Sequence, residues 1–200
     1  MRMEKSYIEA IVGSVTSLIL GALGAIKWLL PWMAARKTAA HAERYQEGLT
    51  ALASALRRME GMLKDIAPCG RVLLMSGHNG GGMPRIGSPY YVTCVHHVHD
   101  STVNPGMPPY VHVGVDLSYI ELLLKVISDG FVRYEFPAGA MLTDFYEAEG
   151  VQDSVLCYLG VYDKHLYYMS AASYGERFSP AEVTRIRLTC STIANDFRNF

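Results

Sequence analysis

The sequence has few charged residues and no excess of either sign. Lysine, arginine, aspartate and glutamate make up 18% of its 200 residues, against about 25% in a typical soluble protein. The formal net charge is −1, so the chain lacks the basic excess by which proteins bind nucleic acid. We therefore expect no nucleic-acid partner. Half of the residues are hydrophobic, which is enough for a buried core.

Cysteine is also scarce, and no two cysteines form a C-x-x-C pair. The four residues, Cys69, Cys94, Cys157 and Cys190, are too scattered for a disulfide scaffold. We expect free, buried thiols in a reducing compartment. A nucleophilic Cys94 or Cys157 is disfavoured, because both lie within apolar segments where thiols are usually inert. No catalytic constellation is present, so the sequence does not indicate an enzyme.

The N-terminal segment contains a long stretch without charged residues. Residues 10–26 include no lysine, arginine, aspartate or glutamate. The length of this stretch is near the minimum for a transmembrane helix. Trp28 and Trp32 follow where an interfacial belt would lie. Residues 1–33 are therefore predicted to be a single-pass membrane anchor, and the basic residues that follow favour a cytoplasmic C-terminal domain. A cleaved signal peptide, an interfacial helix and a buried core helix remain alternatives.

Two repeating patterns predict self-association. Within the anchor, Gly13, Ser17 and Gly21 recur every fourth residue, a spacing that allows two helices to approach closely. Residues 34–67 are predicted to form a helical stalk. Its apolar residues are spaced three and four apart, as in the seam of a parallel coiled coil, but the same seam would also pack on the chain's own domain. The seam residues are Leu49, Leu52, Leu56, Met59 and Leu63.

Residues 70–200 are predicted to form an α+β domain with a mostly antiparallel sheet and flanking helices. Ser118 and Glu121 form a possible capping box for one helix, and Ser179 and Glu182 form another. The segment 154–173 has the pattern of a β-hairpin with its turn at "DKH". The other expected strands are 71–75, 90–98, 110–115 and 131–136, and the expected helices begin near 118, 140 and 180.

The segments "GVQDSVLCYLGVYDKHLYYMSAAS" and "RFSPAEVTRIRLTCSTIANDF" resemble the second half of a GAF domain, a fold related to the PAS domain. This resemblance implies a small-molecule pocket beneath the helices, or an empty descendant of one. It also implies parallel dimers held by the first and last helices. No residue pattern identifies a ligand or cofactor.

The loop "SGHNGGGMPRIGSP" is rich in glycine but does not match a phosphate-binding loop. It lacks the required lysine, and its prolines prevent an immediate helix. We expect it to connect two strands. Its alternative role is a lid over a ligand or partner, with His78 and Asn79 as the polar contacts.

The segment "CVHHVHD" offers further candidates. His97 and His99 share one face of a strand, and with His112 they form a weak candidate for a metal site. A pH-responsive surface and ordinary strand residues are the alternatives. Tyr134 is a candidate pocket-lining residue, although strand tyrosines mainly pack in the core.

These features predict a membrane-anchored, dimeric GAF-like sensory or regulatory domain that binds a small ligand or a partner protein and signals in trans. The alternative is a non-catalytic, membrane-tethered scaffold with an empty pocket. A sensor needs a concave site with converging polar groups. A scaffold would fill that space with tyrosine and methionine side chains.

Overall fold

The computed structural model describes residue 36 and residues 42–43, 45–80, 84–101 and 110–198. The chain divides into two compact units, Met1–Leu49 and Thr50–Phe200, and the fold below is that of the second. Among the described residues, no helix has the length and apolar character needed to span a membrane. The expected anchor, with Gly13, Ser17 and Gly21, lies outside them.

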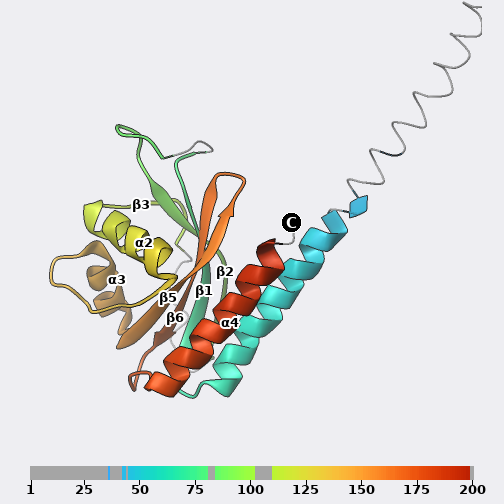
Figure 1. The fold of residues 1–200 in the computed structure, drawn as a ribbon. Helices are drawn as coiled ribbons and strands as arrows, with labels where there is room; N and C mark the ends of the chain where they lie inside the picture. The colour runs from blue at the N-terminus through green and yellow to red at the C-terminus, as the bar shows by residue number, and fades with distance from the viewer. Residues whose placement is uncertain (1–35, 37–41, 44, 81–83, 102–109, 199–200) are drawn as a thin grey trace, which may run out of the picture. The chain divides into compact units, whose positions relative to one another are not determined.

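The second unit is built on one six-stranded antiparallel sheet (Figure 1). The strand order is β3-β2-β1-β6-β5-β4, so β1 and β6 form the centre and β4 is an edge strand. The strands are β1 (Cys69–His78), β2 (Tyr91–His99), β3 (Val113–Gly114), β4 (Phe131–Arg133), β5 (Asp153–Tyr162) and β6 (His165–Ser173).

Helices cover both faces of the sheet. The helix that ends at residue 65 packs beside α4 (Pro180–Arg198) on one face. The other face carries α2 (Leu117–Asp129) and α3 (Met141–Glu149) (Figure 1). The expected α+β class is therefore confirmed, with helices on both faces of the sheet.

Alternating side chains of each strand build two cores. On β1, Val72 and Leu74 pack towards α4, whereas Leu73 and Met75 pack towards α2 and α3. This period of two is why a strand buried on both faces reads as a continuous apolar run in the sequence. Each core removes its residues from water, which is the main favourable contribution to folding.

Part of the predicted coiled-coil seam belongs to the domain's own core. Met59 is fully buried against the sheet and α4, and Leu52, Leu56 and Leu63 pack partly against the same core. At Met59 the structure thus shows the alternative packing, in which the seam lies on the chain's own domain. Leu49, in the first unit, is 53% exposed.

Local capping signals locate most of the element ends. Gly130 and Gly150 end α2 and α3 in the left-handed conformation. In the expected capping box before α4, the Ser179 N–H donates to the Glu182 carboxylate at 2.7 Å. The cap of α2 was misplaced, however. Asp116 accepts from the Tyr119 N–H at 3.0 Å, and Ser118 lies within the helix.

Candidate functional site

Four tyrosine side chains are buried in the core between the sheet and the α2–α3 layer. Tyr119, Tyr134, Tyr146 and Tyr168 are each no more than 6% exposed. Their hydroxyls are bonded internally: Tyr119 to Tyr168 at 2.8 Å, Tyr134 to Thr143 at 2.9 Å and Tyr146 to Ser154 at 2.9 Å. Burial raises the pKa of all four phenols, which therefore stay neutral. Hydrogen-bonded tyrosines thus occupy the place where the resemblance implied a pocket.

A buried ion pair joins α3 to the sheet beside these tyrosines. The guanidinium of Arg71 lies 2.5 Å from the carboxylate of Glu149, and both side chains are almost fully buried. Tyr110 donates a short hydrogen bond to the same carboxylate. Burial alone would lower the pKa of Arg71, but Glu149 and the nearby tyrosines raise it above its usual value. The guanidinium of Arg71 therefore stays charged.

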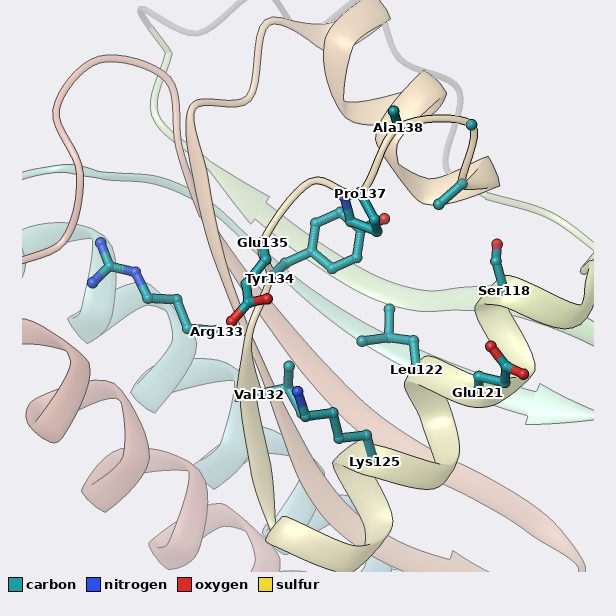
Figure 2. Close-up of a pocket in the computed structure, with 12 residues that line it drawn as sticks. Ser118, Glu121, Leu122, Lys125, Val132, Arg133, Tyr134, Glu135, Pro137 and Ala138 are labelled. Atoms are coloured by element: carbon teal, nitrogen blue, oxygen red, sulfur yellow. The ribbon is translucent and has the colours of Figure 1, made fainter.

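A surface groove of about 380 Å³ lies between α2 and β4 (Figure 2). We call it the α2–β4 groove. One wall is a single face of α2, and the other is the edge strand with the turn that follows it. It is lined by Ser118, Glu121, Leu122, Lys125, residues 132–135 and residues 137–140.

The groove runs along the unpaired edge of β4. The Tyr134 N–H donates to the Ser154 carbonyl at 2.8 Å, and the Tyr158 N–H donates to the Gly130 carbonyl at 2.9 Å. In an antiparallel pair the bonded positions alternate. The N–H and C=O groups of Arg133 therefore point away from β5, as do those of residue 131. Within the described part of the chain, no strand pairs with this side of β4.

The groove has three exposed charges and one that is bound internally. Glu121, Lys125 and Glu135 are exposed, and none of them takes part in the ion pairs found between described residues. Arg133, in contrast, is directed away from α2 (Figure 2) and binds Asp153. The groove therefore offers two carboxylates and one ammonium group to a binding partner.

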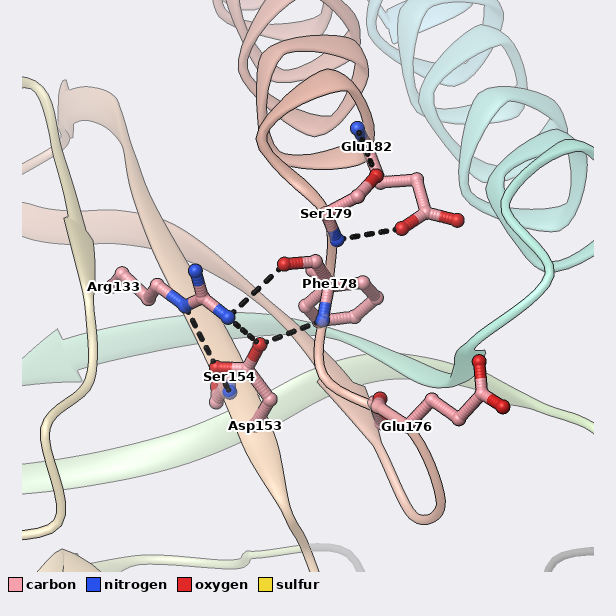
Figure 3. A network of polar contacts seen from close by, with 8 residues as sticks. Arg133, Asp153, Ser154, Glu176, Phe178, Ser179 and Glu182 are labelled. Carbon is pink, nitrogen blue, oxygen red and sulfur yellow. Dashed lines mark hydrogen bonds and ion pairs between the residues drawn. The ribbon is translucent and has the colours of Figure 1, made fainter.

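The contact with Asp153 fixes β4 in place (Figure 3). The Asp153 carboxylate accepts from Arg133 Nη2 at 2.6 Å and Nε at 3.1 Å, and from the Phe178 N–H at 2.8 Å. The same Arg133 nitrogen donates to the Phe178 carbonyl at 3.0 Å. Bidentate, charge-assisted bonds of this kind are strong and directional. They tie the edge strand to the segment that leads into α4.

A second hollow, of about 390 Å³, lies beside the glycine-rich loop. Residues 84–86, Ser88 and Tyr90 form one side, and Leu123, Leu124 and Ile127 of α2 form another. Its lining is mainly apolar, and the polar residues Arg85 and Ser88 that line it are exposed. His78 and Asn79, the expected lid contacts, do not line it.

The histidines fall into two separate groups. The rings of His97 and His99 stack at 5.6 Å, as expected for one face of a strand. His112 instead lies 5.2 Å from His78 and stacks on Tyr91 at 4.0 Å. The reason is the pairing of β2 with β3. It places His112 opposite Thr93, whose hydroxyl oxygen accepts from the His112 N–H, and not beside His97. Among the described residues, no three metal-binding side chains are arranged to hold an ion, and the three weak candidates are not brought together.

The expected ligand-binding residues do not form one site either. The ring of His78 stacks on the ring of His165, which in turn stacks on Tyr167. Tyr167 packs on the face of the sheet that α4 covers. Tyr134 belongs to the core on the opposite face, where it also lines the α2–β4 groove. His97 pairs with Leu73, a residue of that same core but on a different strand from Tyr134. Only Tyr134 lies at a candidate site.

Sequence reasoning missed the groove residues other than Tyr134, and it missed the ion pairs of Arg71 with Glu149 and of Arg133 with Asp153. One signal was present for each pair. Arg71 is a lone charge at the start of an apolar strand, and Asp153 opens another. Charges at such positions need a partner when they are buried. No local pattern indicates the groove, because it depends on how α2 lies beside the edge strand.

Comparison with known proteins identifies the fold. No protein-family model and no curated protein matches the sequence. The GAF domain of a two-component sensor histidine kinase from Bacillus halodurans matches with a TM-score of 0.50 at 7% identity, over 74% of this chain and 94% of that chain. A GAF domain/HD domain protein from Geobacter sulfurreducens matches with a TM-score of 0.50 at 12% identity, over 76% and 95%.

NpR6012g4, a red/green cyanobacteriochrome, matches in its red-light-absorbing state with a TM-score of 0.51 at 10% identity. The match covers 74% of this chain and 94% of that chain. At such low identity these similarities establish the fold alone. Residues 50–200 thus have a GAF-like fold, and the resemblance in the sequence is confirmed at that level.

Proposed function

We propose that this chain is a membrane-anchored, dimeric GAF-like regulatory domain that acts in trans by binding a partner protein at its surface. The observation that carries the proposal is the filled interior. Four buried tyrosines, bonded to one another or to nearby hydroxyls, occupy the space beneath α2 and α3. That arrangement favours action through protein contacts over sensing of a small molecule in the interior.

The anchor and the dimer rest on the sequence and on the exposed surface of the helical layer. Residues 10–26 have the composition of a membrane span, and the basic residues after it favour a cytoplasmic domain. Ile186, Cys190 and Ile193 bury one face of α4 in the core, whereas Leu188 is 64% exposed. An exposed leucine on the terminal helix suits a parallel contact with the same helix of a second chain.

Native mass spectrometry of the full-length chain in detergent micelles, purified without chelator, tests this function. We expect twice the mass of the chain and no added mass. Leu188→Asp should give a monomer. Leu124→Asp, which changes an equally exposed leucine of α2, should leave the dimer intact. A retained small molecule would overturn the filled-interior argument, and a monomeric parent chain would overturn the dimer.

A further inference from the structure

We propose that the α2–β4 groove binds an extended peptide segment of a partner protein, which adds to β4 as a further strand of the sheet. The inference deepens the proposed function by naming the surface and the form of the partner. It rests on the direction of the free backbone groups, on the shape of the groove and on its unmatched charges.

The backbone of β4 presents hydrogen-bonding groups in the pattern that an added strand needs. The outward groups of β4 belong to residues 131 and 133, and the same alternation, continued past the Tyr134 N–H that is bound to β5, places the N–H of residue 135 on this side. At roughly 3.3 Å per residue this edge is about 13 Å long, enough to pair with four or five residues of a peptide. Pro137 follows soon after, so the edge is short. A short edge limits indiscriminate pairing with other sheets.

A helix flanks this edge, which turns it into a groove. Glu121, Leu122 and Lys125 are spaced so that they lie on one face of α2, towards the edge strand (Figure 2). A strand laid along β4 would direct every second side chain towards this face. Leu122 and the aliphatic part of Lys125 offer an apolar contact to those side chains. Addition of a strand beside a helix is an established mode of peptide recognition, in which backbone bonds give affinity and alternate side chains give specificity.

The charges indicate the composition of the peptide. Arg133 is neutralised by Asp153, which leaves two carboxylates, Glu121 and Glu135, against the single ammonium of Lys125 in the groove. A partner segment with an apolar residue next to a basic one would fill the apolar contact and balance this excess. The strand at the opposite edge of the sheet is shorter, since β3 has two residues and β4 has three.

Glu135 allows a matched test of the backbone contact. We infer that its N–H points outward, because the N–H of the preceding residue, Tyr134, is bound to β5. Its side chain is in none of the ion pairs found among the described residues. Glu135→Ala removes the carboxylate alone, whereas Glu135→Pro removes the carboxylate and the outward N–H. Neither change removes a hydrogen bond between β4 and β5. The difference between the two variants therefore isolates one backbone donor.

A display library of random short peptides would be selected on the full-length chain in detergent micelles. We expect enriched peptides in which a basic residue adjoins an apolar one. Their affinity should fall about tenfold more in Glu135→Pro than in Glu135→Ala, because a donor to the peptide backbone is lost. Hydrogen exchange of the parent chain gives an independent readout should the proline variant fold poorly. Bound peptide should slow amide exchange across residues 131–135.

Three results would overturn the inference: no enriched peptide, equal binding by the proline and alanine variants, or no slowing of exchange at β4. Loss of the dimer in Glu135→Pro alone would also overturn it, because the occupant would then be a second copy of the chain. The proposed function is tested separately by native mass spectrometry. It is supported, whatever the peptide result, if the parent chain is a dimer without a bound ligand and Leu188→Asp is a monomer. Failure of the peptide contact is thus distinguishable from failure of the function.

Discussion

The ion pair between Arg71 and Glu149 should stabilise the attachment of α3 to the sheet, and its removal tests the account of the buried polar site. Both side chains are almost fully buried, and their charged atoms lie 2.5 Å apart. Glu149 is the last residue of α3, where the helix dipole disfavours a negative charge. Its carboxylate therefore depends on Arg71 and on the hydroxyl of Tyr110.

Removing one charge leaves the other buried without its counter-ion, which costs about 3–5 kcal/mol. We expect this loss of unfolding free energy for Arg71→Met and for Glu149→Gln. The glutamine retains an oxygen that can accept from Tyr110, so its cost comes mainly from the lone guanidinium. At about 2–4 °C per kcal/mol for a chain of this size, each variant should melt about 6–20 °C below the parent.

The double variant Arg71→Met/Glu149→Gln contains neither charge. Its loss should be only about 1–2 kcal/mol, because a buried pair often contributes little over uncharged replacements. Thermal unfolding followed by near-ultraviolet circular dichroism gives the unfolding free energies of the parent, the two single variants and the double variant. These four values make up a double-mutant cycle. The coupling should survive high salt, since buried pairs are poorly screened. Additive single effects, or single losses below about 1 kcal/mol, would refute the interpretation of a dry, charged pair.

Three further outcomes are expected from thermal unfolding of the full-length chain. Tyr168→Phe should cost about 1–3 kcal/mol, because it leaves the buried Tyr119 hydroxyl without its partner; a neutral result would mean that water reaches the tyrosine layer. Gly160→Ala should cost about 1–3 kcal/mol, since the added methyl would lie 2.5 Å from the ring of Tyr162; an unchanged melting temperature would show that this ring moves freely. Burial, together with His165 and His112, lowers the pKa of His78 in the folded chain. Its stabilising contribution is therefore present above its unfolded value of about 6.5 and is lost as the pH falls through the lowered value, so His78→Asn should flatten the acid side of the stability profile.

Local sequence signals predicted the elements of the GAF-like domain well. Glycines after α2 and α3 and the capping box before α4 act through neighbouring backbone groups, so a few residues suffice to recognise them. The cap of α2 failed for a related reason. Asp116 and Ser118 are both good caps, and only the Tyr119 N–H, bound to Asp116, distinguishes them.

Sequence patterns that fit more than one tertiary arrangement predicted less about the packing. Apolar residues spaced three and four apart define one face of a helix, whether that face meets a second chain or a sheet. The spacing around Met59 therefore predicted a helix with a buried face, while the sheet alone determines what buries it. The ion pair of Arg71 with Glu149 was also not predictable from local sequence. The two residues are far apart in the chain and meet only because α3 packs on β1.

The groove shows why a surface site of this kind is hidden in the sequence. Its backbone groups face outward because Tyr134, and not Arg133, is bonded to β5. A shift of one residue in this pairing would turn the outward groups towards the sheet and reverse every side chain. The ion pair of Arg133 with Asp153 opposes such a shift, because it holds the side chain of an edge residue on the segment before α4. The residue whose backbone is free for a partner is thus the one whose side chain fixes the register.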